Sequence, residues 1–233
     1  MKGQKIYVTV AVVVVLLAAG LFLIERAEAP TDIESSLNEP SKSGILPIGN
    51  LADAPTVTLA PEIKFVGPRE GIPEDAPVAY GFWSFAMPVP GVLSRSGQPL
   101  IGEFEWLRQQ GWRGVVDLRV DGERDEVGDD RKLPGFDALG FNYLALPIID
   151  GHPPTDEQAE QFLTFVTDAA NQPVHVHCRG GIGRAGTMVA LYRYAVQGWP
   201  LDKAIEESRA FQGGISEMQK TWLEGWAAEH PNF

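Results

Sequence analysis

Cysteine is nearly absent from this sequence: Cys178 is the single thiol among 233 residues. One thiol cannot form an internal disulfide, and it cannot supply the several cysteine ligands of a structural zinc site. Cys178 is therefore either a small buried side chain or a chemically reactive one.

Positive charge is also scarce, because 19 lysines and arginines face 31 acidic side chains and leave a formal net charge of −12. An acidic surface repels the phosphate backbone of nucleic acids, so no nucleic-acid partner is expected. The sequence contains no internal repeat, and its hydrophobic content of 44% suffices for the core of one globular domain.

One long run without charge lies near the N-terminus, over residues 6–24, after a short segment over residues 1–5. As a helix rising about 1.5 Å per residue it would cross roughly 28 Å, close to the hydrocarbon thickness of a bilayer. We therefore predict a transmembrane helix or signal anchor. Lys2 and Lys5 precede the run, so the positive-inside tendency places the following domain outside the cytosol, as in a bacterial periplasm. Residues 27–29 (AEA) resemble a signal-peptidase site, which makes secretion after cleavage the alternative.

The rest of the chain divides into two parts. Residues 25–77 are rich in proline, serine and acidic side chains without a sustained period, which predicts a flexible proline-rich linker. Over residues 78–233, strand-like and helix-like segments alternate, which predicts an α/β domain with a central, mostly parallel sheet flanked by helices. Strands are expected over 114–118, 141–146 and 174–177, and helices over 98–110, 155–170, 184–197, 201–211 and 216–228.

The cysteine lies in a glycine-rich loop, residues 178–184 (CRGGIGR), between a predicted strand and a predicted helix. Glycines allow successive N–H groups to point inward, and the helix N-terminus adds partial positive charge at the same place. That field would stabilise Cys178 as a thiolate nucleophile, and the planar fork of Arg184 would bind two phosphoryl oxygens. The expected phosphate-binding residues are Arg179, Gly180, Gly181, Ile182, Gly183 and Arg184.

Residues 177–187 (HCRGGIGRAGT) resemble the His-Cys-x5-Arg signature of the protein tyrosine and dual-specificity phosphatases. The resemblance extends over residues 78–229 and implies the cysteine-dependent phosphatase fold, a phosphocysteine intermediate and no metal or other cofactor. It gives His177 the role of ordering the loop. It also implies a phosphorylated protein as partner, carrying phosphotyrosine or, in addition, phosphoserine and phosphothreonine. Rhodanese-like sulfurtransferases also hold a cysteine in such a loop, but they need no acid residue upstream.

Such an acid is present as Asp150, in the segment 146–154 (LPIIDGHPP) that follows a predicted strand. This segment resembles the mobile general-acid loop of the same phosphatases, from which a carboxylic acid would protonate the leaving group. Taken alone, an aspartate before glycine is more often a turn residue. The rival carboxylates fall on a predicted helix and are expected to be solvated: Asp156, Glu157 and Asp168.

Two upstream segments, 93–99 (LSRSGQP) and 115–119 (VVDLR), resemble elements of dual-specificity-like domains, notably bacterial ones. Their roles are expected to be structural. Ser96 would cap the first helix, and Asp117 and Arg119 would tie the sheet edge to its neighbouring loops, with a place for Arg119 close to the pocket as the alternative.

The histidines near the cysteine raise the question of a metal site. His175, His177 and Cys178 are close in sequence, and the two histidines share one face of the predicted strand. A tetrahedral site needs a fourth ligand, and none is evident. We therefore expect no metal at these residues.

One position departs from the resembling family. Most of its members carry serine or threonine directly after the signature arginine, where the hydroxyl binds the cysteine sulfur and eases its departure from phosphorus. Here that position is Ala185, and Thr187 lies further along the helix. We expect the phosphocysteine to form and to break down slowly.

Three functions remain open on these residues. The first is a tyrosine or dual-specificity protein phosphatase. The second is a phosphatase of inositol phosphates, phosphoinositides or other small phosphoesters, whose polyanionic substrates usually need several basic loop residues, whereas only Arg179 is added here. The third is a non-catalytic phosphate-binding module, which Ala185 suggests and which the combination of Cys178, Arg184 and Asp150 argues against.

Overall fold

The computed structural model describes residues 63–78, 81–122 and 128–231. The predicted membrane segment over residues 6–24 and most of the predicted linker lie outside these residues. Within the described ranges, every helix is too short or too polar to cross a bilayer.

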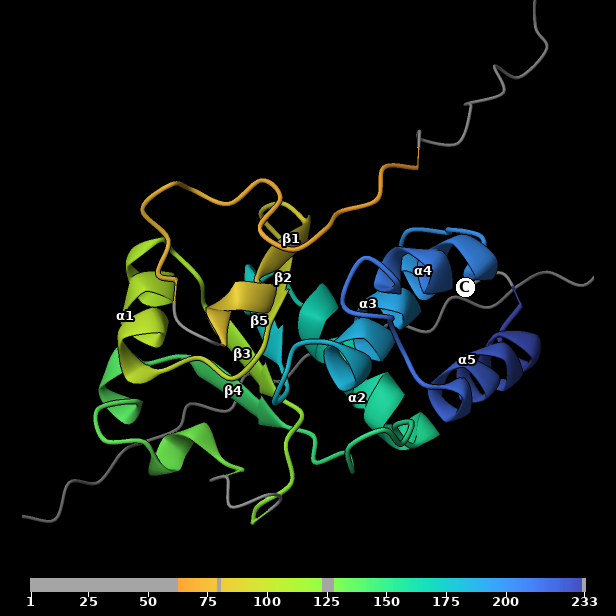
Figure 1. The fold of residues 1–233 in the computed structure, drawn as a ribbon. Coiled ribbons are helices and arrows are strands. Elements are labelled where there is room, and N and C mark those ends of the chain that lie inside the picture. The colour runs from red at the N-terminus through yellow and green to blue at the C-terminus, as the bar shows by residue number, and fades with distance from the viewer. Residues whose placement is uncertain (1–62, 79–80, 123–127, 232–233) are drawn as a thin grey trace, which may run out of the picture. The chain divides into compact units, whose positions relative to one another are not determined.

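A five-stranded sheet with the order β1-β2-β5-β3-β4 forms the centre of the domain (Figure 1). The strands β2, β5, β3 and β4 are parallel, and β1 runs antiparallel to β2 at one edge. This confirms the predicted mostly parallel sheet, and the three expected strands agree with β3, β4 and β5 to within one residue at either end. The bounds are Ala86–Val89 for β1, Leu93–Ser96 for β2, Gly114–Asp117 for β3, Asn142–Ala145 for β4 and Val174–His177 for β5.

Two strands were not among those expected from the sequence. Pro88 lies within β1 and argues against a strand there, and β2 carries the polar run Ser94, Arg95 and Ser96, which lacks the apolar pattern of a buried strand. All four residues of β2 are nevertheless buried. Their polar groups find partners inside the domain, as described below.

Helices cover both faces of the sheet (Figure 1). Successive strand residues point to opposite faces, so Val115 joins a core with α1, whereas Val116 joins a core with the other helices. Thr155 caps α2 as predicted, through a capping box with Gln158. The bounds are Ile101–Gln109 for α1, Asp156–Thr167 for α2, Gly183–Ala195 for α3, Leu201–Ser208 for α4 and Glu217–Glu229 for α5.

The first helix corrects one expectation. It begins at Ile101 rather than near residue 98, and its N-cap is Leu100 instead of Ser96. The backbone N–H of Leu100 donates to the Glu103 side chain at 2.5 Å, so that glutamate supports the helix start. Ser96 is the last residue of β2 and lies too early in the chain to serve as the cap.

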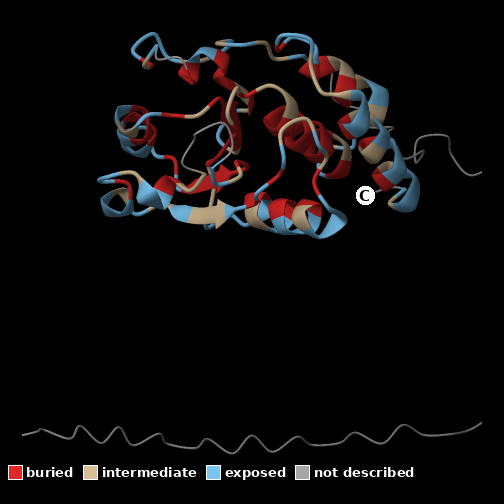
Figure 2. Cartoon of the chain, turned by 60° about the horizontal axis from the view of Figure 1, so that its bottom comes forward, coloured by how far each residue is buried: buried red, intermediate tan, exposed pale blue. Residues whose placement is uncertain are grey.

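The helix α3 is buried on nearly all sides, between the sheet and the outer helices (Figure 2). Its core residues include Ala185, Met188 and Leu191, each fully shielded from solvent. A helix that is buried all round is held by packing rather than by an amphipathic face. The start of α3, directly after the cysteine loop, is therefore rigidly placed.

Residues 63–77, the part of the predicted linker that the structure describes, contact the domain. The backbone N–H of Val66 donates to Glu207 at 3.0 Å, and the ring of Phe65 lies 6.2 Å from that of Trp199. Glu207 also accepts two hydrogen bonds from Arg193, at 2.9 and 2.6 Å. The Arg193 guanidinium in turn stacks 4.0 Å from the centre of the Trp199 ring. One buried carboxylate thus joins α3, α4 and the segment over residues 63–78.

We predict that Glu207→Ala lowers the free energy of unfolding by about 3 kcal/mol or more, because it leaves the buried Arg193 charge without its partner. The measurement is urea unfolding followed by tryptophan fluorescence. Glu206→Ala is the matched control: it breaks an exposed ion pair with Lys203 on the same helix and is expected to change stability by less than about 1 kcal/mol. Equal losses in the two variants would contradict the role given to Glu207.

Candidate active site

The cysteine loop leaves the sheet at its centre. Strand β5 lies between β2 and β3, and its last residue, His177, directly precedes Cys178. Because the three strands are parallel, the residues that follow β2 and β3 flank the loop at the same edge of the sheet. The loop closes at Gly183, where α3 begins.

The carbonyls of Arg179 and Gly180 in the loop are bound by donors from outside it. The carbonyl of Arg179 accepts the backbone N–H of Gln98 at 3.0 Å. The carbonyl of Gly180 accepts the hydroxyl of Ser84 at 2.8 Å. Both donors come from segments packed against the outer side of the loop, so these carbonyls are directed away from its interior.

The next two carbonyls share one donor. Nη2 of Arg95 donates to the carbonyl of Ile182 at 3.0 Å and also to that of Gly181. On the inner side, the N–H of Gly181 donates to Sγ of Cys178 at 3.2 Å. Carbonyls bound outside and an N–H directed to the sulfur are the geometry that an anion-binding nest requires.

Glycine is needed where two backbone segments cross. Gly181 has a φ of +70°, and a Cβ there would lie 2.4 Å from the backbone nitrogen of Gly97. A Cβ at Gly97 would lie 2.9 Å from the carbonyl oxygen of Arg179. Any larger residue at either place would push the loop away from β2, which explains physically why glycine follows Ser96 in the LSRSGQP segment.

Two of the three residues predicted from the sequence as catalytic, Arg184 and Asp150, lie close together, and Cys178 begins the loop that Arg184 ends. Cys178 and Arg184 are both buried, at 2% and 1% exposure. Nη1 of Arg184 donates to the carbonyl of Ile148 at 3.0 Å, and Nη2 lies 3.5 Å from Oδ1 of Asp150. The Asp150 side chain is 39% exposed. The loop arginine therefore connects the cysteine loop to the segment that carries the acid.

That acid segment is held at several points. Ser216 Oγ donates to the carbonyl of Gly151 at 2.7 Å, and Gln219 Nε2 donates to the carbonyl of His152 at 3.0 Å. Both donors belong to the N-terminal turn of α5, and with Arg184 they fix the segment on two sides. These contacts are made to the segment that, by its family resemblance, is expected to be the mobile general-acid loop.

His177 belongs to a chain of buried charges on the α1 face of the sheet. Its Nε2 lies 2.7 Å from Oδ2 of Asp130. Oδ1 of Asp130 accepts from Arg119 Nη2 at 2.7 Å, and Arg119 also binds both carboxylate oxygens of Asp117, at 3.0 and 2.8 Å. These contacts fix the ring of His177 directly before the cysteine. They agree with the expected roles of Asp117 and Arg119 as ties between the sheet edge and its loops.

Sequence reasoning missed Asp130. It lies in a charged stretch, residues 120–132, that reads as a solvated loop, yet it is fully buried. Burial alone would raise the pKa of Asp130, but His177, Arg119 and Gln98 lower it below its usual value. The sequence offers only the pair Asp129–Asp130 as an indication of a buried acid, and it does not tell which of the two is buried.

The two carboxylates of this group already have a cationic partner. Oxygens of Asp117 and Asp130 and a nitrogen of His177 lie within 4.8 Å of one another, which is compatible with a metal cluster. The guanidinium of Arg119 lies against both carboxylates and supplies the positive charge that an ion would bring. A metal ion there would have to displace it.

His175 is separate from the cysteine. Its two ring nitrogens bind Ser94 Oγ at 2.8 Å and Ser96 Oγ at 2.9 Å. The ring is fully buried, and burial with the nearby His177 keeps its pKa well below the usual range. Alternation along β5 directs both histidines to the α1 face, whereas Cys178 packs in the core of the other face. His175, His177 and Cys178 therefore do not converge on one point.

Ala185 lies buried at the start of α3. The nearby hydroxyl of Thr187 donates to the carbonyl of Gly183 at 2.9 Å, within the helix. Thr187 thus satisfies its hydroxyl along the helix backbone rather than at the cysteine sulfur. It does not replace the hydroxyl that Ala185 lacks.

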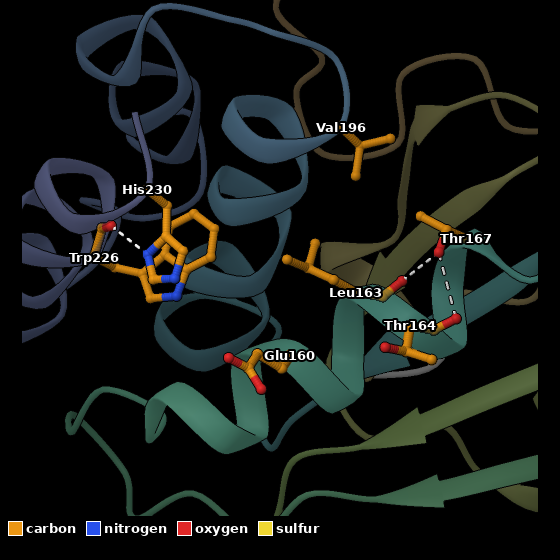
Figure 3. Close-up of a pocket in the computed structure, with 7 residues that line it drawn as sticks. All are labelled: Glu160, Leu163, Thr164, Thr167, Val196, Trp226 and His230. Carbon is orange, nitrogen blue, oxygen red and sulfur yellow. Dashed lines mark hydrogen bonds between the residues drawn. The ribbon is translucent and has the colours of Figure 1, made fainter. Parts of the chain in front are cut away.

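A pocket of about 400 Å³ lies elsewhere, between α2, the end of α3 and α5 (Figure 3). Trp226 and His230 stack along one side, with their rings 4.1 Å apart. Glu160 and two threonines of α2 line the opposite side. None of the residues predicted for the site lines this pocket, so it is distinct from the cysteine loop.

Comparison with known proteins gives a family match. The profile described as "DSP-PTPase phosphatase fused to NAD+ Kinase" matches residues 90–224, more than half of the chain. The probable NAD kinase 2, chloroplastic, of Oryza sativa is 33% identical over 106 residues, which are 44% of this chain and 10% of that protein. A β-lactamase hydrolase-like protein of Agrobacterium fabrum is 30% identical over 152 residues, which are 60% of this chain and 32% of that protein. The chain thus spans about a tenth to a third of the length of these relatives.

A solved structure agrees with the family match. The crystal structure of PTPMT1 in complex with PI(5)P is 25% identical, with a TM-score of 0.51 over 59% of this chain and 91% of that chain. The residues matched by the profile include the strands β2 to β5 and the cysteine loop described above. This chain belongs to the DSP-PTPase family of dual-specificity-like protein tyrosine phosphatase domains that the profile describes.

Proposed function

We propose that the domain hydrolyses phosphomonoesters through a phosphocysteine at Cys178. The observation that carries the proposal is the loop itself: four consecutive carbonyls, from Arg179 to Ile182, are bound by donors from outside, and Arg184 at its end lies 3.5 Å from Asp150. A phosphate dianion in that loop would meet inward N–H groups, the start of α3 and the Arg184 guanidinium. These groups also favour a thiolate at Cys178, the nucleophile that the reaction needs.

The reaction has two balanced steps. In the first, the Cys178 thiolate attacks phosphorus, the bond from phosphorus to the leaving oxygen breaks, and protonated Asp150 gives its proton to that oxygen. In the second, the Asp150 carboxylate takes a proton from water, the water oxygen attacks phosphorus, and the S–P bond breaks to return the thiolate. Arg184 stabilises the charge on the equatorial oxygens in both transition states.

Phosphorylated proteins are the substrate class that we propose first. Arg179 is the only basic loop residue besides Arg184, which suits a substrate with one phosphate better than a polyanion. Phosphoinositides are the second candidate, because the similar PTPMT1 structure contains PI(5)P. A panel of phosphopeptides, phosphoinositides and inositol phosphates, assayed with and without EDTA, ranks the two classes and tests for metal dependence.

The place of action remains a sequence-based proposal. The uncharged run over residues 6–24 would anchor the chain in a membrane, with the domain outside the cytosol, or would be removed after secretion. That run lies outside the described residues, so its support is its length and composition alone.

Cys178→Ser tests the nucleophile. We expect hydrolysis of p-nitrophenyl phosphate to fall by about 10⁴-fold or more, because a serine hydroxyl at this place is not ionised at neutral pH. Binding of tungstate, a non-covalent phosphate analogue, measured by isothermal titration calorimetry, should persist because the loop N–H groups and Arg184 remain. A variant that keeps full activity would exclude Cys178 as the nucleophile. If the wild-type protein binds tungstate but hydrolyses no substrate, the result would favour the non-catalytic phosphate-binding module.

Asp150→Asn tests the acid. An amide cannot supply the proton, so kcat should fall by about 10²-fold or more for alkyl phosphates and much less for p-nitrophenyl phosphate, whose leaving group needs little protonation. Asp156→Asn is the matched control, because that carboxylate lies nearby on α2 and accepts a hydrogen bond from Trp222 instead. The assignment fails if the two variants lose activity equally, or if the loss is independent of the leaving group.

Ala185→Ser tests the missing hydroxyl. We expect steady-state kcat to rise by about tenfold, the worth of one hydrogen bond of about 1.4 kcal/mol to the departing sulfur. Rapid-quench measurements should show a smaller burst of product, since less phosphocysteine accumulates. Ala195→Ser makes the same change at the other end of α3 and should leave the burst unchanged. An unaltered burst in Ala185→Ser would mean that breakdown of the intermediate is not limiting.

A further inference from the structure

Arg95 is a buried arginine that the proposed reaction does not use. It lies in β2, beside β5 (Figure 1), and its strand partner is Val176, two residues before Cys178. Its side chain is 1% exposed and is directed to the α3 face of the sheet, against Gly186. It therefore lies beneath the cysteine loop, on the side away from solvent.

The guanidinium of Arg95 is unusual in lacking a carboxylate partner. Its Nη2 is engaged with two loop carbonyls, those of Gly181 and Ile182. Its plane lies 3.8 Å from the centre of the Phe211 ring. Among the described residues, no carboxylate is within ion-pair distance of it, and Nε has no hydrogen-bond partner. A buried cation is costly unless it is paired, so an anion in the loop would be a favourable counter-charge.

The charge state of Arg95 fits this placement. Burial lowers its pKa to about 10, while the negative charges of Cys178 and Glu207 act in the opposite direction. At neutral pH the side chain is therefore protonated.

We propose that Arg95 is a positioning residue for the phosphate loop: it holds the Gly181 and Ile182 carbonyls outward and so directs the intervening N–H groups to the sulfur and to bound phosphate. Its buried positive charge adds to that of Arg184, the last residue of the loop. The inference rests on the proposed function, because it concerns the same loop. It gives β2 a part in substrate binding that its polar sequence, LSRS, does not reveal.

A second buried arginine in the same domain shows the contrast. Arg193 also stacks on an aromatic ring, that of Trp199, at 4.0 Å. Its charge is neutralised by Glu207 through two hydrogen bonds, at 2.9 and 2.6 Å. It lies near the C-terminal end of α3, three turns away from the loop. Arg193 is thus the structural counterpart of Arg95, and it provides a matched control.

Other charged groups near the loop also influence the pH profile of Cys178 alkylation. Asp150 approaches from the acid segment, and Glu207 from α4 acts on Arg95 at longer range. The His177–Asp130 pair lies on the opposite face of the sheet. The variants below leave all of these in place, together with Arg179 and Arg184 in the loop.

The experiment compares Arg95→Met, Arg95→Lys and Arg193→Met in the full chain. Orthovanadate binding reports the loop as an anion site, and the pH profile of Cys178 alkylation by iodoacetamide reports the thiolate without any need for turnover. We expect Arg95→Met to weaken vanadate binding by about tenfold or more and to move the alkylation profile to higher pH by about one unit. Arg95→Lys should recover part of both effects, because it restores the charge but not the planar fork.

The control variant distinguishes a positioning role of Arg95 in the loop from a contribution to stability alone. Arg193→Met should lower the melting temperature and leave vanadate binding and the alkylation profile unchanged. If Arg95→Met behaves in the same way, Arg95 is merely structural and the inference is overturned. If Arg95→Met does not fold, the decision passes to Arg95→Lys and to Ser84→Ala, which removes only the donor to the Gly180 carbonyl. Wild-type readouts in both would overturn the inference.

Failure of the proposed function would look different. A wild-type protein that binds vanadate and alkylates at low pH but hydrolyses no phosphoester would contradict the hydrolysis proposal. The effect of Arg95 on vanadate binding and on alkylation would still be measured in that case.

Discussion

The cysteine loop can bind an anion only if its carbonyls face outward, and much of the surrounding structure follows from that constraint. An outward carbonyl that is buried needs a donor, and the donors come from Gln98, Ser84 and Arg95. Strand β2 must therefore lie directly beside β5, and Gly97 must let the two backbones approach closely. The LSRSGQP segment, which resembles a family element in sequence, supplies both the support for the loop and the space for it.

Although the chain is acidic overall, several of its arginines are buried close to the cysteine loop and to the sheet beside it. On the α1 face of the sheet, Arg119 is neutralised by Asp117 and Asp130, and this closed group orients His177. On the α3 face, Arg184 lies 3.5 Å from the partly exposed Asp150, and Arg95 has no carboxylate within ion-pair distance among the described residues. A net charge of −12 does not oppose this, because the field at the loop is set by the nearest groups.

The connection between α4 and α5 joins the two functional segments. Phe211 covers the guanidinium of Arg95, which supports the cysteine loop. A few residues later, Ser216 and Gln219 hold the carbonyls of Gly151 and His152 next to the acid. A shift of this connection would therefore act on the nucleophile and on the acid together. The placement of Asp150 depends on these tertiary contacts as much as on its own loop.

The sequence by itself determined the local features. The 174–177 strand, the glycine loop that contains Cys178 and Arg184, and the Thr155 cap follow from short-range patterns, because glycine freedom, helix capping and strand periodicity act over a few residues. Asp150 was singled out by the resemblance of its segment to the general-acid loop of the family. Tertiary structure decided what depends on contacts between distant residues. In the folded domain the polar strand β2 is buried, and Asp130, not Asp129, pairs with His177. Ser96 binds His175 instead of capping the first helix, and Arg95 lies under the cysteine loop. These choices are invisible in the sequence because a polar residue in a buried strand reads as a loop until its partners, about 80 residues away, are brought beside it.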